Sequence, residues 1–227
     1  MQNNKTKKAL LLISGGIDSP VAAKLAQEKG YELEAIHFSQ EPFTDNTPEI
    51  KSLKLCKLLG IKRLIVVEAG ESLEEIADKT YREYYFILMK RFMMRVSEII
   101  AKEKEYEYLV TGESIGQVSS QTISNLNTIN QSTELEILRP VLFMQKQEII
   151  DISQKNSFFE ISKGAEMCDA LAFGSPKTRS SIENVSTQEE RCQIIELINK
   201  AAKKIRIEDT NKKVQFPNQI INLCKWV

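Results

Sequence analysis

The residues with the clearest chemical potential lie in the stretch SGGIDSP, residues 14–20, between an apolar segment and an amphipathic one. Its two adjacent glycines allow positive φ angles and a close approach of the backbone to a ligand. A serine or aspartate can cap the helix that follows, and a proline suits its first turn. A helix that begins at the carboxyl end of a strand offers unpaired N–H groups to a phosphate. The stretch therefore indicates an anion-binding loop.

Two widespread nucleotide-binding signatures do not occur in the chain. The patterns GxxxxGK[ST] and GxGxxG are both missing, so the loop carries no lysine of its own. A pair of glycines alone also suits a strand-to-helix turn that binds nothing. The loop by itself leaves both interpretations open, and other parts of the chain must decide between them.

Short apolar segments alternate with longer amphipathic ones along the chain. The pattern predicts strands over residues 7–13, 31–38, 63–69, 106–112 and 136–142, and helices over about 18–29, 47–59, 72–104, 144–156 and 188–204. Such alternation requires crossover connections, and hence a parallel sheet covered on both faces. We expect an α/β fold with a five-stranded parallel sheet and a ligand site at the carboxyl ends of its strands. Residues 113–134 are too long and polar for a mere linker, so we expect a functional loop there.

Composition narrows the class of protein. The 227 residues are 42% hydrophobic and 27% charged with zero formal net charge, which is typical of a globular protein and indicates no polyanionic partner. The C-terminal region is locally basic, which we take first as a solvated surface. No apolar run reaches the length of a membrane span, and the polar start MQNNKTKK does not resemble a signal peptide. We expect a cytoplasmic protein with no membrane contact.

The pattern SGGxDS resembles the PP-loop of the ATP pyrophosphatases, whose fold is the three-layer, Rossmann-like adenine nucleotide alpha hydrolase fold. Further stretches narrow the resemblance: HF at 37–38 with PFT at 42–44, MKRFMMR at 89–95, TGESIGQVSSQT at 111–122, and LRPV at 138–141 followed by Lys146. Together they are similar to the tRNA 4-thiouridine synthetases, also known as thiamine-biosynthesis sulfurtransferases, over about residues 8–178. The resemblance implies a PP-loop domain over residues 1–180, with 181–227 as a helical extension of the same domain.

The resemblance implies an ATP-dependent tRNA sulfurtransferase. In that family ATP, with Mg²⁺, activates the uridine at position 8 of tRNA as an adenylate and releases pyrophosphate, and a sulfur nucleophile then displaces AMP to give 4-thiouridine. Carried over by position, Asp18 acts at the phosphates or their Mg²⁺. The implied ATP contacts are Leu12, Ile13, Ser14, Gly15, Gly16, Asp18, Ser19, His37, Phe38, Lys90, Gly112 and Gln121. We expect no resident metal site of protein ligands, because His37 is the only histidine.

One position departs from the family pattern. Lys90 stands where the family usually has an ATP-contacting arginine. Lysine keeps the charge but lacks the planar fork that makes two hydrogen bonds to a phosphate. The neighbouring Arg91 is a candidate to compensate. Met93 and Met94, further along the same predicted helix, are expected to pack in the core.

The resemblance assigns a second catalytic role to Cys168, which would take up a persulfide sulfur or resolve the disulfide formed during transfer. Its neighbours Glu166 and Asp169 do not favour the thiolate, so activation would have to come from a lysine, a helix N-terminus or the substrate. The four cysteines are scattered without a CxxC pair, which argues against a zinc site or a disulfide framework. Cys56 has core spacing. A cysteine desulfurase or another persulfide carrier would have to supply the sulfur.

The family normally carries a THUMP domain that holds tRNA ahead of the PP-loop, and some members add a rhodanese-like domain. Here the loop begins at residue 14, so we expect weak binding of tRNA by this chain alone. A separate THUMP-type protein, a homodimer or the basic C-terminal region would then provide docking. Two other functions stay open: an adenylating sulfurtransferase or ligase that acts on a small molecule or carrier protein, and a non-catalytic nucleotide- or RNA-binding partner.

Overall fold

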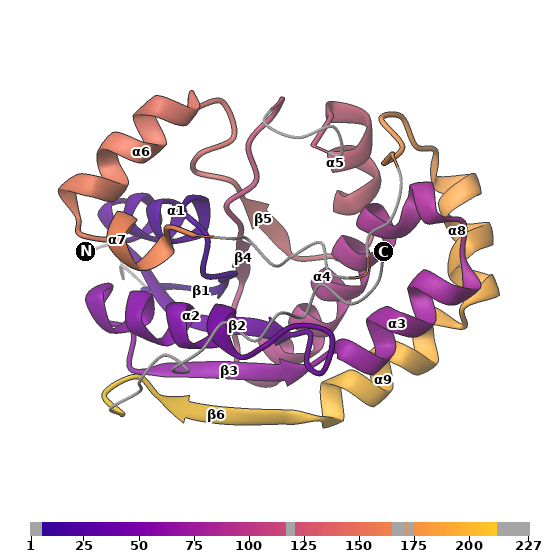
Figure 1. Cartoon of the computed structure of the whole chain (residues 1–227), viewed down its shortest axis with the longest axis horizontal. Coiled ribbons are helices and arrows are strands. Elements are labelled where there is room, and N and C mark those ends of the chain that lie inside the picture. Colours follow the sequence, from indigo (N-terminus) through magenta and orange to yellow (C-terminus); the bar gives the residue numbers. More distant parts are fainter. Residues whose placement is uncertain (1–5, 117–120, 165–170, 172–174, 213–227) are drawn as a thin grey trace, which may run out of the picture.

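The computed structural model describes residues 6–116, 121–164, 171 and 175–212, and Figure 1 shows a central sheet flanked by helices. The strands are β1 (Lys7–Leu12), β2 (Tyr31–Ser39), β3 (Arg63–Glu68), β4 (Tyr108–Val110), β5 (Glu136–Leu138) and β6 (Ile205–Asp209). The helices are α1 (Asp18–Glu28), α2 (Thr47–Leu58), α3 (Gly70–Lys79), α4 (Tyr85–Glu103), α5 (Ile123–Asn130), α6 (Lys146–Lys155), α7 (Phe159–Ser162), α8 (Ile182–Arg191) and α9 (Ile194–Lys203), with a 3₁₀ turn at Arg82–Tyr84.

The sheet has the strand order β5-β4-β1-β2-β3-β6. Its first five strands run parallel, as the alternation of segments predicts. The prediction of five strands is incomplete, because β6 adds a sixth, antiparallel strand beside β3. The sequence carries little sign of β6, since its short run IRIED directly follows a helix and none of its five residues is buried. The chain returns from β3 to the other side of β1 to form β4, so the strand order reverses between β1 and β4. Ligand sites of open α/β sheets form at such a reversal.

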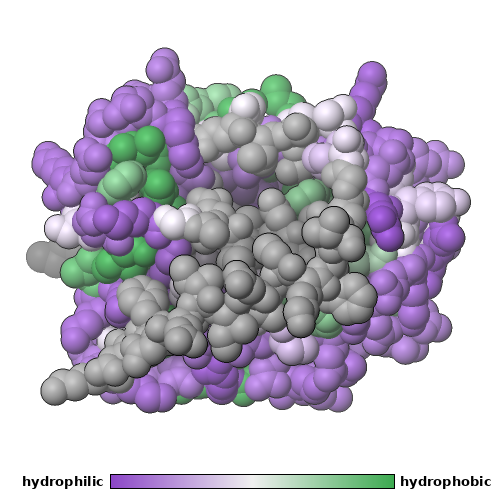
Figure 2. Space-filling model, viewed as in Figure 1, coloured by the Kyte–Doolittle hydropathy of each residue, from purple (hydrophilic) through white to green (hydrophobic). Residues whose placement is uncertain are grey.

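Two apolar cores lie on the two faces of the sheet. Along β1, Ala9 and Leu11 pack with residues of α1 and α2, whereas Leu10 packs with residues of α3, α4 and α9. Successive side chains of a strand point to opposite faces, so the apolar run Ala9–Leu12 of β1 serves both cores. In the view of Figure 2 hydrophilic residues cover α3 and α8, on the outer side of the helical layer. Among the described residues no helix combines the length and apolar character needed to cross a membrane.

Several predicted elements are divided or shortened. The helical segment 72–104 breaks after α3, where Thr80 has extended φ and ψ of −120° and 166°. The segment 188–204 lies across α8 and α9, which are separated at Gln193 by a left-handed residue with φ of 52°. The predicted strands 106–112 and 136–142 keep only three residues each as β4 and β5. The polar segment 113–134 contains α5, whose first turn is capped by the Thr122 hydroxyl.

A buried ion pair joins α4 to the C-terminal helices. The guanidinium of Arg91, only 1% exposed, donates from Nε to Glu189 Oε1 at 2.7 Å and from Nη2 to Glu189 Oε2 at 3.1 Å. It also donates to the carbonyl of Thr128 in α5, and Arg95 donates to Glu189 Oε2 at 3.2 Å. Arg91 therefore ties three helices together and does not reach the ligand loop. The expectation that Arg91 compensates for Lys90 is wrong, because its fork is fully used in the core.

We predict that Glu189→Gln lowers the free energy of unfolding by about 3–5 kcal/mol, because it leaves the buried Arg91 charge without its counter-ion. Urea denaturation followed by circular dichroism measures the change. The neighbouring Glu190 is exposed, so Glu190→Gln is the matched control and should stay within about 0.5 kcal/mol of the original chain. Equal denaturation midpoints for the two variants would contradict a structural role for the pair.

Candidate active site

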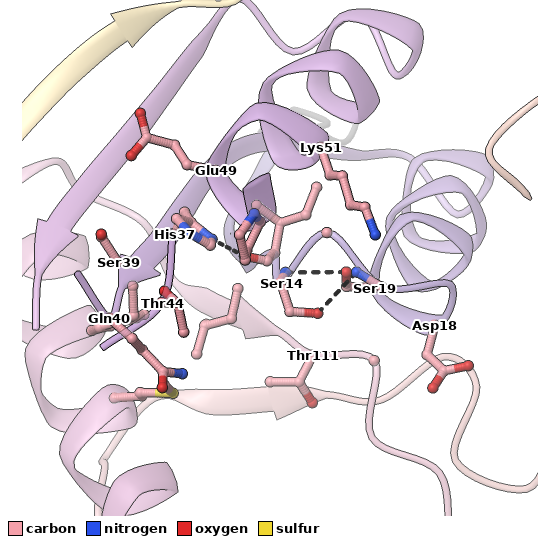
Figure 3. A pocket seen from close by; sticks show the side chains of 18 of the residues that line it. Ser14, Asp18, Ser19, His37, Ser39, Gln40, Thr44, Glu49, Lys51 and Thr111 are labelled. Carbon is pink, nitrogen blue, oxygen red and sulfur yellow. Dashed lines mark hydrogen bonds between the residues drawn. The ribbon is translucent and has the colours of Figure 1, made fainter. Parts of the chain in front are cut away.

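A pocket opens at the carboxyl ends of β1, β2 and β4, next to the N-terminus of α1 (Figure 3). It gathers the residues that sequence reasoning assigned to the nucleotide, although they come from positions more than 100 residues apart. The structure places all twelve in its lining: Leu12, Ile13, Ser14, Gly15, Gly16, Asp18, Ser19, His37, Phe38, Lys90, Gly112 and Gln121. Residues at the ends of separate strands therefore line one common site.

Packing against α2 and internal hydrogen bonds fix the conformation of the glycine loop, residues 14–19. Gly15 has a φ of +81°, and a Cβ atom there would lie 2.8 Å from the carbonyl oxygen of Pro48 in α2. The Ser14 N–H donates to Ser19 Oγ at 3.3 Å, and the Gly16 N–H donates to Ser14 Oγ at 3.4 Å. The expected side-chain cap on α1 is not formed, because Ile17 occupies the N-cap position. The first N–H groups of α1 are therefore available to an anion.

Gly112 brings the end of β4 against the start of α1. A Cβ atom at Gly112 would lie 2.6 Å from the Ser19 nitrogen and 2.8 Å from the Asp18 carbonyl carbon. Any larger residue would push the two segments apart, because Cβ atoms essentially never approach a backbone atom within 3.0 Å. The glycine requirement here is steric, and it fixes the width of the pocket between α1 and β4.

Asp18, at the first position of α1, forms an ion pair that sequence reasoning missed. Lys146 Nζ lies 2.7 Å from Asp18 Oδ1, and both side chains are partly exposed. Lys146 is the first residue of α6, where a positive charge is unfavourable to the helix dipole. Lys146 follows the LRPV stretch in the sequence, but nothing in that pattern indicates that it contacts Asp18. The pair places one negative and one positive group beside the loop.

A buried carboxylate lies behind Lys90. Glu113 is 2% exposed, and its Oε2 accepts from Arg139 Nε at 2.7 Å and from Thr111 Oγ1 at 3.1 Å. Lys90 Nζ lies 3.9 Å from Glu113 Oε1. Burial alone would raise the pKa of Glu113, but the charges of Lys90 and Arg139 with these hydrogen bonds hold that pKa below its usual value. Glu113 is therefore an anion that keeps the Lys90 ammonium at the pocket wall.

The structure adds a lysine that the loop itself lacks. Lys51 of α2 lines the pocket and donates to the carbonyls of Ser162 at 3.3 Å and Lys163 at 3.1 Å. Ser162 Oγ donates to the carbonyl of Gly16 at 3.3 Å. The end of α7 is therefore fastened to the glycine loop. Because Lys51 lies far from the loop in sequence, the motif gave no sign of it.

Two methionines have different surroundings. Met94 is fully buried in the core, as the sequence predicts. Met93 packs against the same core, as predicted, but it is only partly buried and also lines the pocket with Met89. One turn of α4 therefore contributes apolar surface to the site.

His37 is a neutral residue that fastens β2 to the end of β1. Its Nδ1 lies 2.9 Å from the carbonyl oxygen of Ile13 and 3.3 Å from Ser52 Oγ. A carbonyl only accepts, so Nδ1 carries the proton and Nε2 has the lone pair. Burial lowers the pKa of His37, against smaller opposing effects of the Ile13 carbonyl and Glu49. The ring lines the pocket as an uncharged side chain.

The His37 pKa predicts how stability depends on pH. The folded chain keeps His37 neutral, whereas the unfolded chain binds a proton near pH 6.5, so the free energy of unfolding should fall on acidification below about pH 6.5. One proton gives a slope of at most about 1.4 kcal/mol per pH unit. Urea denaturation at pH 7.5, 6.5 and 5.5 measures it, and the slope should decrease in His37→Asn, which keeps an N–H donor. Identical slopes in both chains would show that His37 is not the group responsible.

Cys168 and Cys224 lie outside the described residues. Cys56 and Cys192 are buried and free. Burial raises the pKa of the Cys56 thiol to about 12 and that of Cys192 to about 11. Both are therefore unreactive thiols near neutral pH, as expected for Cys56 from its core spacing. Within the part of the chain that the structure describes, no group of three or more histidine, cysteine, aspartate or glutamate side chains could hold a metal ion.

Comparison with known proteins gives a consistent result. Residues 4–194 match the family model described as "Thiamine biosynthesis protein (ThiI)". A probable tRNA sulfurtransferase of Alkaliphilus oremlandii is 39% identical over 207 residues, which cover 88% of this chain and 53% of that protein. A probable tRNA sulfurtransferase of Streptococcus uberis is 38% identical over 214 residues, with 92% and 53% covered. The chain spans about half the length of these curated relatives.

Solved structures agree with this relationship. A crystal structure of a 4-thiouridine synthetase–RNA complex with bound ATP superimposes with a TM-score of 0.82 and 32% identity, over 89% of this chain and 55% of that one. NMN synthetase from Francisella tularensis, at a TM-score of 0.57 and 16% identity over 94% of this chain and 90% of its own, shares the fold alone. Because the family model matches residues 4–194, which is more than half of the chain, the chain belongs to the thiamine biosynthesis protein (ThiI) family.

Proposed function

We propose that this chain is the adenylating part of an ATP-dependent tRNA sulfurtransferase that makes 4-thiouridine. The observation that carries the proposal is the uncapped N-terminus of α1 at the carboxyl end of β1, with the Asp18–Lys146 pair beside it. The 4-thiouridine synthetase with bound RNA and ATP, 32% identical, supports the same assignment. In this proposal residues 181–227 belong to the same domain as 1–180, which the pairing of β6 with β3 supports.

Different pocket residues contact different parts of ATP in this proposal. The N–H groups of the loop 14–19 and of the first turn of α1 bind the phosphates. Lys51, Lys90 and Lys146 surround that end of the pocket with positive charge. Charge that builds up on the pyrophosphate as it leaves is stabilised by such fixed donors and cations. We propose that the remaining nucleotide contacts come from the ends of three strands and from the polar segment after β4: Leu12, Ile13, His37, Phe38, Gly112 and Gln121.

A single carboxylate fits the requirements of a phosphate-bound Mg²⁺. Mg²⁺ in nucleotide sites is commonly held by one or two carboxylates together with substrate phosphates and water. Asp18 is the residue at the loop that would hold it, since only its Oδ1 accepts from Lys146. When bound, the ion would neutralise phosphate charge.

The reaction then proceeds in two displacements. The uridine O4 attacks the α-phosphorus as the N3 proton is lost, and the bond to pyrophosphate breaks. A sulfur nucleophile next attacks C4, and AMP leaves. We propose that Cys168 takes part in this second step, either by carrying a persulfide or by resolving a disulfide. The target is the uridine at position 8 of tRNA.

The proposed reaction also requires partners that dock the tRNA and supply the sulfur. Phosphate contacts dominate the affinity of proteins for tRNA, and this chain has zero formal net charge. A THUMP-type protein or a second copy of the chain is therefore proposed to dock the tRNA. A cysteine desulfurase or another persulfide carrier supplies the sulfur, and the reaction takes place in the cytoplasm.

We predict that Asp18→Ala lowers ATP-dependent pyrophosphate release by at least about 100-fold, because it removes the charge that faces the phosphates and their Mg²⁺. Release is measured with and without unmodified tRNA, which should stimulate it. Asp151→Ala, at an exposed position of α6, is the matched control and should release pyrophosphate at the original rate. Cys168→Ser should keep pyrophosphate release and lose thiouridine formation.

Two results would contradict the proposal. If the original chain releases pyrophosphate at the same rate with and without tRNA, even with a THUMP-type protein added, tRNA is not its substrate. If Asp18→Ala keeps full activity, the loop is not the phosphate site.

A further inference from the structure

Two large apolar side chains are exposed at the end of the sheet that carries the pocket. Phe143 is 84% exposed, and Ile123 is 72% exposed. Phe143 lies between β5 and α6, and Ile123 is the first residue of α5. Figure 1 shows α5 and α6 on either side of the segments that leave β4 and β5. Both side chains therefore lie near the carboxyl ends of the strands, where a costly exposed apolar surface requires an explanation.

A hydrogen bond fixes the turn of Phe143 against a segment that lines the pocket. The Leu142 carbonyl accepts from the Ile115 N–H at 2.8 Å. Two residues before Ile115, Glu113 lines the pocket. Three residues after Phe143, Lys146 pairs with the carboxylate of the glycine loop. Phe143 is therefore an exposed ring that a fixed turn holds beside the pocket.

Ile123 has a cationic neighbour, Arg179. The hydroxyl groups of the two residues that flank Ile123 donate to the carbonyls of the two residues that flank Arg179, at 2.8 Å and 3.0 Å. Arg179 is exposed and has no ion-pair partner among the described residues. Gln121, two residues before Ile123, lines the pocket. The polar segment 113–134, which we expected to be functional, therefore holds an apolar and a cationic group beside the pocket.

We call Ile123, Phe143 and Arg179 the rim of the pocket. None of the three lines the pocket itself, so they are not placed to contact a nucleotide bound inside it. Apolar and aromatic side chains stack on unpaired bases, and arginine binds phosphates or stacks on bases as well. The composition of the rim therefore suits a single-stranded or distorted part of an RNA.

The proposed reaction creates such a distortion. A uridine in a folded RNA is stacked on its neighbours, so its O4 reaches an ATP in the pocket only when the base leaves the stack. A neighbouring base then loses a stacking partner, which an apolar side chain at the same place can replace.

We propose that the rim contacts the RNA around the target uridine. The Phe143 ring stacks on a base that the uridine leaves exposed, Ile123 adds apolar contact, and Arg179 binds a backbone phosphate. The inference rests on the proposed function and adds a surface through which a chain of zero net charge contributes to RNA affinity.

Binding of unmodified tRNA, followed by fluorescence anisotropy at several salt concentrations, tests the stacking contact. Phe143→Ser should lower the affinity about tenfold and leave its salt dependence unchanged, because one base–aromatic stack is lost. A fully paired RNA duplex offers no unstacked base, so it should bind both chains equally. Leu58→Ser, at an exposed apolar position at the far end of α2, is the matched control and should keep the original affinity.

The same titrations test the phosphate contact. Arg179→Gln should reduce the slope of log affinity against log salt by about one, because one phosphate contact is lost. Lys57→Gln, at an exposed position near the same end of α2, is the control and should keep the slope. Circular dichroism checks that each variant is folded.

Three results would overturn the RNA contact: no measurable affinity of the original chain for tRNA, an unchanged affinity in Phe143→Ser, or an unchanged slope in Arg179→Gln. The proposed function is judged separately, by whether tRNA together with a THUMP-type protein stimulates pyrophosphate release by the original chain. If the Phe143→Ser chain binds tRNA normally but no longer accepts sulfur from a cysteine desulfurase, the rim contacts a protein, and the proposal is wrong.

Discussion

The close approach of β4 to the start of α1 is the constraint on which the site depends. At Gly112 there is no room for a side chain, since a Cβ atom would lie 2.6 Å from the Ser19 nitrogen. This contact brings the segment after β4, with Thr111 and Glu113, against a loop that lies almost 100 residues earlier. It also places the uncapped end of α1 between two parallel strands, where its N–H groups face a shared pocket. A wider gap would separate Lys90 of α4 and Glu113, just after β4, from the glycine loop.

Charge in the site is arranged across elements and not within a motif. The lysines come from α2, α4 and α6, and each has an oxygen partner: carbonyls at the end of α7 for Lys51, Glu113 for Lys90 and Asp18 for Lys146. Such partners fix the ammonium groups in place before an anion arrives, which limits the reorganisation that binding requires. Arg91, adjacent to Lys90 in sequence, belongs instead to the core, where Glu189 neutralises it.

The sequence was sufficient for features that depend on local pattern. Alternating segments predicted the parallel sheet, and the SGGxDS loop with its companion motifs predicted twelve residues that line one pocket. It was not sufficient for pairings formed only by the fold. Lys146 meets Asp18 across 128 residues, and Arg91 meets Glu189 across 98. The antiparallel strand β6 was missed for a related reason, since its pairing depends on where α9 ends.

Strand β6 has a consequence for the behaviour of the chain in solution. By pairing with β3, from Arg63 opposite Asp209 to Val67 opposite Ile205, it covers the backbone of a strand whose central side chains are completely buried. Without that cover, β3 would present a row of free N–H and carbonyl groups on an apolar strand, which is a template for strand pairing between molecules. β6 therefore prevents the edge of β3 from pairing with strands of other molecules. Its own alternation of charged and apolar residues, with Arg206 bound to Glu49 and Glu208, makes the new edge a poor partner for another sheet.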